Sequence, residues 1–233
     1  MDEAEFDRFA DEYHHHHAAN IKASGEAPEF FAKYKVDDVS AVLRRSGGRP
    51  ARILDFGGGV GNSLGPMRAA FPGSEIILLD PSSRSLEIAR RRHPAGATFQ
   101  QFDGRRIPLP DKAVDLVFAS CVFHHIPADL HVPLLREIDR VLAPGGNLFV
   151  FEHNPYNPIT VRAVRDCPFD DCAVLISAAT MRQRLDDAGL TANRVVYRIF
   201  FPHFLRGLRA TERCLAHLPL GAQYYAHAIK AAA

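Results

Sequence analysis

Two aspartates and a cluster of glycines form the most distinctive chemical pattern in the sequence. A short apolar run leads into Asp55 and Phe56, and glycines follow at positions 57, 58, 59 and 61. Glycine has no β-carbon and accepts a positive φ, so such a turn lets a ligand approach the backbone closely. Asp80 ends a second apolar run about 20 residues beyond the glycines, where an acid can bind ribose hydroxyls. Together these residues predict a nucleoside site.

The glycine spacing argues against two common nucleotide-binding loops. A Gly-x-Gly-x-x-Gly dinucleotide motif that starts at Gly57 would need glycine at position 62, which is Asn62, and a start at Gly59 fails at Leu64. No lysine follows the glycines, as a P-loop would require. What remains is Asp-x-Gly-x-Gly-x-Gly, formed by Asp55, Gly57, Gly59 and Gly61.

The elements that position these residues follow from the alternation of apolar runs and amphipathic segments. From Ala51 onward this alternation is typical of a parallel sheet with crossover helices. No helical crossover long enough for parallel entry precedes the last strand, so we expect it to be antiparallel. The expected strands are 51–55, 75–80, 97–101, 114–119, 146–152, 195–201 and 222–230, and the expected helices are 61–71, 82–92, 129–142, 159–165, 178–188 and 203–217.

The glycine pattern resembles motif I of the class I S-adenosylmethionine-dependent methyltransferases, and Asp80 matches the acid that ends their second strand. The resemblance covers roughly residues 50–152. It implies an α/β, Rossmann-like fold: a seven-stranded, mostly parallel sheet with an antiparallel last strand and helices on both faces. It also implies S-adenosyl-L-methionine as cofactor and S-adenosyl-L-homocysteine as product. Later segments, 151–158, 167–172 and 218–225, are similar to a bacterial subgroup associated with sugar and secondary-metabolite pathways.

The N-terminal section is expected to be helical and to belong to one domain with the rest. We expect residues 1–48 to form a helical cap and 49–233 the core, with one helix from Pro28 to Leu43. The cap either packs on the core or, as the resemblance implies, covers the cofactor, with Tyr13 and Tyr34 as lid candidates. Adjacent residues of a helix point in different directions, so the run His14–His17 cannot converge on one ion, and we predict no metal site.

The resemblance implies further cofactor contacts. Phe102 would pack on the adenine ring and Asp103 would accept a hydrogen bond from its amino group; alternatively, Asp103 caps the turn before Gly104. The backbone of Ala119 and Ser120 would lie under the methionine portion. Phe56 and Pro81, each next to one of the two acids, complete the predicted cofactor site.

Polar residues after the fourth and fifth strands predict the acceptor side. His124, His125 and His153 are candidate general bases, because an imidazole titrates near neutral pH and all three lie where α/β sheets place site residues. Cys121 is interpreted as a small buried apolar residue. A polar loop that only satisfies its own turns stays open as the alternative to a substrate pocket formed by Tyr34, Glu152, Asn154, Tyr156 and Asn157.

Composition limits the partners. The chain has 233 residues, 47% hydrophobic residues and a formal net charge of +1, without a basic stripe for nucleic acid or an anionic membrane. The four cysteines show no paired spacing, the acidic N-terminus lacks an apolar signal region, and no apolar run is long enough to span a bilayer. We therefore expect a cytoplasmic protein with a small-molecule substrate; monomer and homodimer both stay open.

The predicted function is methyl transfer from S-adenosyl-L-methionine to oxygen, nitrogen or carbon of a small molecule, such as a sugar or secondary-metabolite intermediate. Two alternatives stay open. One is a non-catalytic nucleoside-binding or scaffold protein with the same fold, and the other is an NAD-dependent oxidoreductase, against which the glycine spacing argues.

Overall fold

The computed structural model describes residues 25–167 and 172–232. Tyr13 and the run His14–His17 lie outside this part of the chain, so the predictions made for them stay predictions. Within the described residues, no helix is long and apolar enough to cross a membrane.

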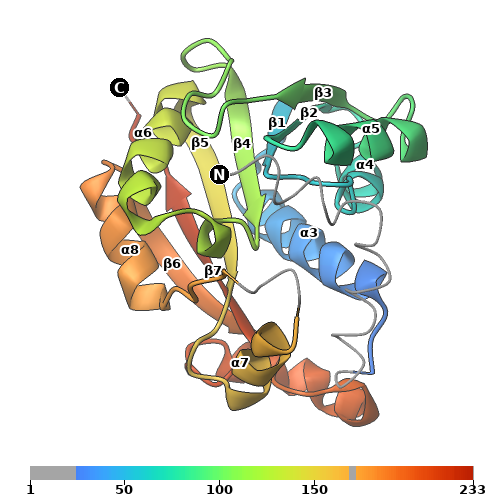
Figure 1. The fold of residues 1–233 in the computed structure, drawn as a ribbon. Coiled ribbons are helices and arrows are strands. Elements are labelled where there is room, and N and C mark those ends of the chain that lie inside the picture. The colour runs from blue at the N-terminus through green and yellow to red at the C-terminus, as the bar shows by residue number, and fades with distance from the viewer. Residues whose placement is uncertain (1–24, 168–171, 233) are drawn as a thin grey trace.

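The centre of the fold is a seven-stranded sheet with the strand order β3-β2-β1-β4-β5-β7-β6 (Figure 1). The first five strands pair in parallel, and β7 runs antiparallel to both β5 and β6. The predicted fold class, including the antiparallel last strand, is therefore confirmed. The strands are β1 Arg52–Phe56, β2 Glu75–Asp80, β3 Thr98–Gln101, β4 Val114–Ser120, β5 Leu142–His153, β6 Thr191–Arg198 and β7 Gln223–Ile229.

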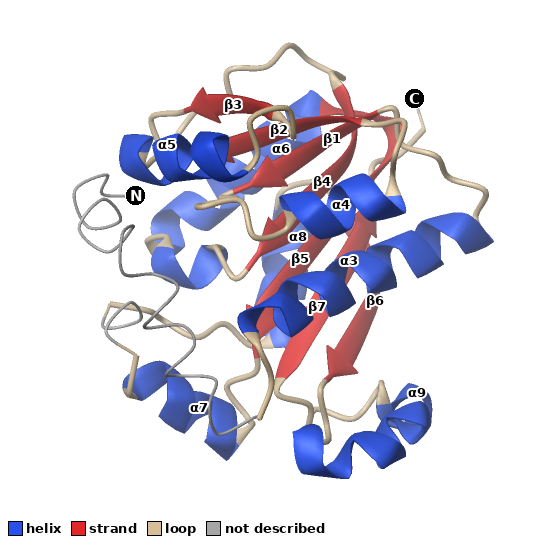
Figure 2. Ribbon diagram, turned by 90° about the vertical axis from the view of Figure 1, so that its right-hand side faces the viewer, coloured by secondary structure: helices blue, strands red, loops and turns tan. Residues whose placement is uncertain are grey.

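Helices cover both faces of this sheet (Figures 1 and 2). Buried side chains of α3, α4 and α5 form one apolar cluster against one face, and those of α6 and α8 join the cluster on the other. The predicted helix that starts at Pro28 is thus part of a core layer, while α7 and α9 lie beyond the end of the sheet (Figure 2). The helices are α3 Pro28–Arg45, α4 Leu64–Ala70, α5 Ser83–Arg92, α6 His131–Val141, α7 Pro158–Arg165, α8 Ala178–Asp187 and α9 Glu212–Leu215.

The strand order reverses direction between β1 and β4. Both strands are almost fully buried, because helices cover both faces of the sheet. Parallel strands buried in this way consist of nearly continuous apolar residues. In open α/β sheets the crevice at the carboxyl ends of the strands, at such a reversal, is where ligands bind. In this chain the residues that follow Phe56 and those that follow Ser120 stand at this reversal.

The structure differs from the sequence expectations mainly in two places. The fifth strand begins at Leu142, because the backbone through Gly145 and Gly146 continues to pair with Lys230 instead of turning away. The expected helix 203–217 is a 3₁₀ segment, His203–Thr211, followed by the single turn of α9. Non-helical dihedral angles at Leu205 interrupt it, and none of its residues up to Thr211 is buried, so core packing does not enforce a regular helix.

Candidate functional site

The glycine turn, residues 57–61, joins the ends of three strands. The amides of Gly57 and Gly58 both donate to the carbonyl oxygen of Leu79, at 2.8 and 3.2 Å, which ties the turn to β2. A β-carbon on Gly57 would lie 2.6 Å from Val122, just after β4, and the φ of 69° at Gly57 also favours glycine. Gly59, with a φ of 50°, has open space where its β-carbon would be. The turn is therefore packed at its start and open in its middle, as a ligand cradle requires.

Asp80 links the second strand to this turn. Its side chain is buried, with Oδ2 accepting from the Gly59 amide at 2.8 Å and Oδ1 accepting from the Ser82 amide at 2.9 Å. Ser82 in turn caps α5, since its hydroxyl accepts from the Ser85 amide. Pro81, between the two, is also buried. Asp80 thus lies beside the open part of the turn, where the sequence predicts a cofactor contact.

Asp55 carries the most informative polar atom of the site. Its side chain is 1% exposed, and within the described residues its Oδ2 has no hydrogen-bond partner. Burial and then the negative charge of Asp80 raise the pKa of the Asp55 carboxyl group to about 7. A buried carboxylate oxygen without a partner costs free energy, which a hydrogen-donating or positively charged ligand would recover. The carboxylate oxygens of Asp55 and Asp80 beside the glycine turn therefore suit a cationic ligand.

The residues predicted at the adenine ring begin with Phe102, which packs on the residue after Asp55. The buried Phe102 ring packs on Phe56 with a centroid distance of 5.5 Å, and Phe56 is completely buried. Asp103 is exposed, and its Oδ1 accepts from the amides of Arg105 and Arg106, each at 2.8 Å. This turn leads through Gly104, which has a φ of 75°. Asp103 thus has the capping role that the sequence left open, and its contact with adenine stays a prediction.

A cluster of polar side chains gathers at the ends of β4 and β5. Ala119 is buried and Ser120 is half-buried, and Cys121 follows with a φ of 58°, unusual for a residue other than glycine. The Lys35 ammonium donates to Ser120 Oγ at 2.8 Å and to Cys121 Sγ at 3.1 Å. Lys35 is itself 5% exposed. We call the group the Lys35 cluster; its members are Tyr34, Lys35, Ser120, Cys121, His153 and Gln223.

His153, the best-placed predicted base, is held by this cluster. Gln223 Nε2 lies 3.3 Å from His153 Nδ1 and 3.8 Å from Cys121 Sγ. The hydroxyl of Tyr34, predicted to contact substrate, is buried and donates to Gln223 Oε1. The half-buried His153 ring is therefore fixed from α3 through β7, although its catalytic role is untested.

Lys35 and Gln223 are site residues that the sequence analysis missed. Lys35 has a recognisable signal, because it shares a helix face with Phe31 and Val39, where a charged residue is out of place. Gln223 has none, since it begins a strand whose partners are distant in sequence.

Glu152 and His124 form a buried pair beside the Lys35 cluster. Glu152 is 0% exposed, its Oε1 accepts from the Phe123 amide at 2.8 Å, and its Oε2 bonds His124 Nδ1. Burial opposes ionisation, but His124 and the Phe123 amide lower the pKa of the Glu152 carboxyl group below its ordinary value. The His124 ring lies tilted against the rings of His125 and His153, at centroid distances of 4.2 and 5.2 Å. The structure brings the three predicted histidines together, but it gives Glu152 no surface that a substrate could reach.

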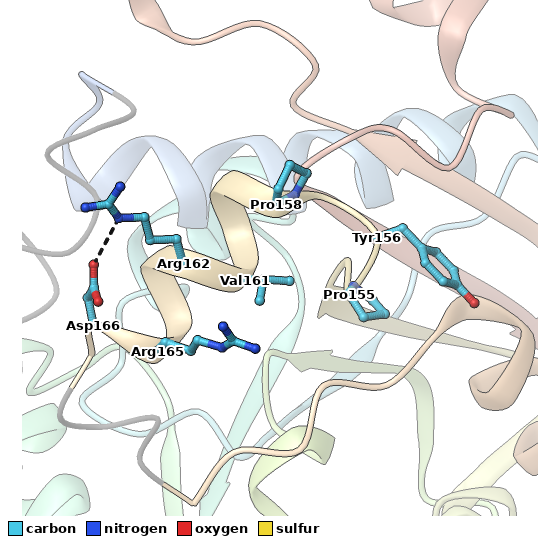
Figure 3. A pocket seen from close by; sticks show the side chains of 7 residues that line it. All are labelled: Pro155, Tyr156, Pro158, Val161, Arg162, Arg165 and Asp166. Carbon is cyan, nitrogen blue, oxygen red and sulfur yellow. Dashed lines mark ion pairs between the residues drawn. The ribbon is translucent and has the colours of Figure 1, made fainter.

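The loop after β5 satisfies many of its own polar groups. Asn154 is buried, donates to the carbonyls of Pro219 and Gly221, and accepts from the Tyr156 amide. Asn157 caps α7 and donates to Leu220. Tyr156 is 62% exposed and lies at one end of an open groove along α7 (Figure 3). The groove is lined by Pro155, Tyr156, Pro158, Val161, Arg162, Arg165 and Asp166. Tyr156 is thus the predicted substrate residue of this loop that faces a groove.

Comparison with known proteins agrees with this geometry. A family model described as a methyltransferase domain matches residues 54–150. Trans-aconitate 2-methyltransferase of Methylobacterium nodulans is 37% identical over 172 residues, which are 69% of this chain and 64% of that protein. Malonyl-[acyl-carrier protein] O-methyltransferase of Methylococcus capsulatus is 35% identical over 114 residues, 48% of this chain and 41% of that protein. The chain spans less than two thirds of the length of these two relatives.

Solved structures support the fold over the whole chain. A SAM-dependent methyltransferase of Thermotoga maritima, described as a possible histamine N-methyltransferase, has a TM-score of 0.69 and 20% sequence identity. The match covers 98% of this chain and 99% of that one. Residues 54–150 therefore match a methyltransferase domain, and at the level of this domain the predicted resemblance to the class I S-adenosylmethionine-dependent methyltransferases is confirmed.

Proposed function

We propose that the protein transfers the methyl group of S-adenosyl-L-methionine to oxygen, nitrogen or carbon of a small molecule, such as a sugar or secondary-metabolite intermediate. The observation that carries this proposal is the Oδ2 of the buried Asp55, which has no hydrogen-bond partner among the described residues and lies next to the turn with the open backbone of Gly59. The bound donor supplies a methyl group already activated by a positively charged sulfonium. Two buried acids beside an open turn suit such a cation.

In this proposal the residues of the glycine end hold the donor. Asp80, already fixed by the amides of Gly59 and Ser82, would bind the ribose hydroxyls. Asp55 Oδ2 would accept a hydrogen bond from the amino-acid portion of S-adenosyl-L-methionine. Phe102, Asp103 and Gly104 would surround adenine, and the main chain of Ala119 and Ser120 would line the far side. Tyr13 would help to exclude water above them, and the division of the chain into residues 1–48 and 49–233 is also a proposal.

The acceptor would lie on the side of His153. A base is needed only when the acceptor atom begins protonated, and His153 is the imidazole that Gln223 holds at the end of β5. His124 would be held in position by its hydrogen bond with Glu152, and His125 would lie beside it. Two relatives are named for methyl transfer to trans-aconitate and to malonyl-[acyl-carrier protein]. These names support a small acid, or its carrier-bound form, as the class of acceptor. Asn154 and Asn157 would shape the loop, and Tyr156 would face the acceptor.

Calorimetry and turnover together test the proposal. We expect S-adenosyl-L-homocysteine to bind and NAD not to bind; the reverse result would favour the oxidoreductase alternative. His153→Ala should lower methyl transfer to a protonated acceptor by about 100-fold while leaving the affinity for S-adenosyl-L-homocysteine unchanged. His217→Ala, at an exposed position, is the matched control. Unchanged turnover in His153→Ala would remove His153 from the role of base, and donor binding without transfer to any acceptor would favour the scaffold alternative.

A further inference from the structure

Lys35 places a buried ammonium group at the end of β4, and no carboxylate of the described residues forms an ion pair with it. The residue is 5% exposed, and its Nζ donates to the Ser120 hydroxyl at 2.8 Å and the Cys121 sulfur at 3.1 Å. The buried Glu152, at the end of β5, is already bonded to His124. A buried ammonium group that lacks an opposite charge is costly, so its presence needs an explanation.

The other polar groups of the Lys35 cluster are neutral or bonded to one another, and Cys121 is the member that can carry a negative charge. Gln223 Nε2 points toward Cys121 Sγ and His153 Nδ1, and Gln223 Oε1 accepts the hydrogen bond from the Tyr34 hydroxyl. Burial would raise the pKa of the Cys121 thiol, but Lys35 and His153 lower it to about 6, against an opposing effect of Glu152. The cysteine can therefore supply the missing negative charge while no other anion is present.

The ammonium is bonded to two residues that are partly exposed to solvent. Ser120 and Cys121, its two partners, are half-buried, and Val122 contacts the glycine turn. An anion that reached Ser120 and Cys121 would therefore meet Lys35 close to the place of methyl transfer. We propose that Lys35 binds a carboxylate group of the methyl acceptor, and that Cys121 provides the counter-charge until the acceptor arrives. This rests on the proposed function for the position of the acceptor.

A pair of alkylating reagents tests the carboxylate preference directly. Iodoacetate and iodoacetamide differ only in whether a carboxylate accompanies the reactive carbon. In both, the Cys121 thiolate forms a sulfur–carbon bond as the carbon–iodine bond breaks and iodide leaves. Peptide mass spectrometry gives the rate at Cys121 and at the exposed Cys214 in the same sample. The ratio of the two reagents at one cysteine cancels the fraction of thiolate, so it reports on the carboxylate alone.

We expect the iodoacetate-to-iodoacetamide ratio at Cys121 to exceed that at Cys214 by about fivefold or more, the effect of one charge attraction at about 4 Å in water. Lys35→Met, which keeps the apolar stem, should bring the two ratios together, and Lys35→Arg should preserve the difference. Equal ratios in the unmodified protein would overturn the proposal, as would a raised ratio that survives Lys35→Met. Failure of both reagents to reach Cys121 would also overturn it, because the surface would then be closed to small anions.

Donor binding separates this proposal from the proposed function. Lys35→Met should bind S-adenosyl-L-homocysteine as tightly as the unmodified protein does, measured by calorimetry on folded material. If neither protein binds it, the proposed function fails whatever the alkylation ratios are. If both bind it and the ratios are equal, only the role of Lys35 fails.

Discussion

At the ends of β1 and β2 two buried acids, Asp55 and Asp80, lie beside the glycine turn. At the ends of β4 and β5 an ammonium, an amide and an imidazole of the Lys35 cluster lie beside the buried Glu152–His124 pair. Asp55 and Asp80 leave the first region rich in acceptors and negative charge. In the second region Lys35 and Gln223 are hydrogen-bond donors, and His153 Nδ1 accepts from Gln223. The two regions meet where Val122 touches the glycine turn. Such a division would attract a cationic donor to one side and an anionic acceptor to the other, and each prediction below changes one side only.

The largest expected effect is on the acid side, in the absence of any ligand. The pKa of Asp55 is raised to about 7, against about 3.9 in an unfolded chain. Between these values the folded state holds a proton that the unfolded state releases, so the free energy of unfolding falls as pH rises and levels off above about pH 7. Asp55→Asn removes this penalty, which is on the order of 4 kcal/mol at most. Denaturant titrations at pH 5 and pH 8 should show a smaller loss of stability in the variant.

The same substitution should oppose donor binding, because the negative charge is lost. Calorimetry should therefore show weaker binding of S-adenosyl-L-methionine to Asp55→Asn at pH 8, despite the more stable protein. Asp129→Asn, at an exposed position, is the control and should change neither property. Parallel pH profiles for Asp55→Asn and the unmodified protein would contradict the charge assigned to this region.

The second effect concerns Asp80, which bonds the turn and the start of α5 at once. Asp80→Ala leaves the amides of Gly59 and Ser82 without this acceptor and removes the predicted ribose contact. Hydrogen bonds to charged groups are each worth about 1.5–3 kcal/mol, so we expect affinity for S-adenosyl-L-homocysteine to fall about 100-fold. Calorimetry measures this, with Lys35→Met, in the other region, as the matched change. Equal affinity in Asp80→Ala would show that the ligand binds elsewhere.

Sequence reasoning found the region around Asp55 and Asp80 more completely than the region around Lys35. Asp55, the glycines and Asp80 lie within a short segment in which local spacing and strand pattern carry the signal. Tyr34, Cys121, His153 and Gln223 come from four distant segments, and only the sheet pairings bring them together. Glu152 shows the same limit, because its place at a strand end suggests a site residue while the register turns it toward His124 in the core. Long-range pairing decides such cases, and one sequence does not contain it.

The smallest effect tests whether the loop after β5 belongs to the region around Lys35 or only supports it. Asn157 Oδ1 accepts from the amides of Ile159 and Thr160 at the start of α7. Losing an N-cap of this kind costs about 1 kcal/mol, so Asn157→Ala should lower the melting temperature slightly and leave donor affinity unchanged. Asn157→Asp keeps the capping oxygen and loses only the bond to Leu220, so it should be closer to the unmodified protein in stability. If Asn157→Ala instead melts normally and raises the KM for the acceptor, Asn157 contacts substrate, as the sequence predicts, and the region around Lys35 extends into the loop.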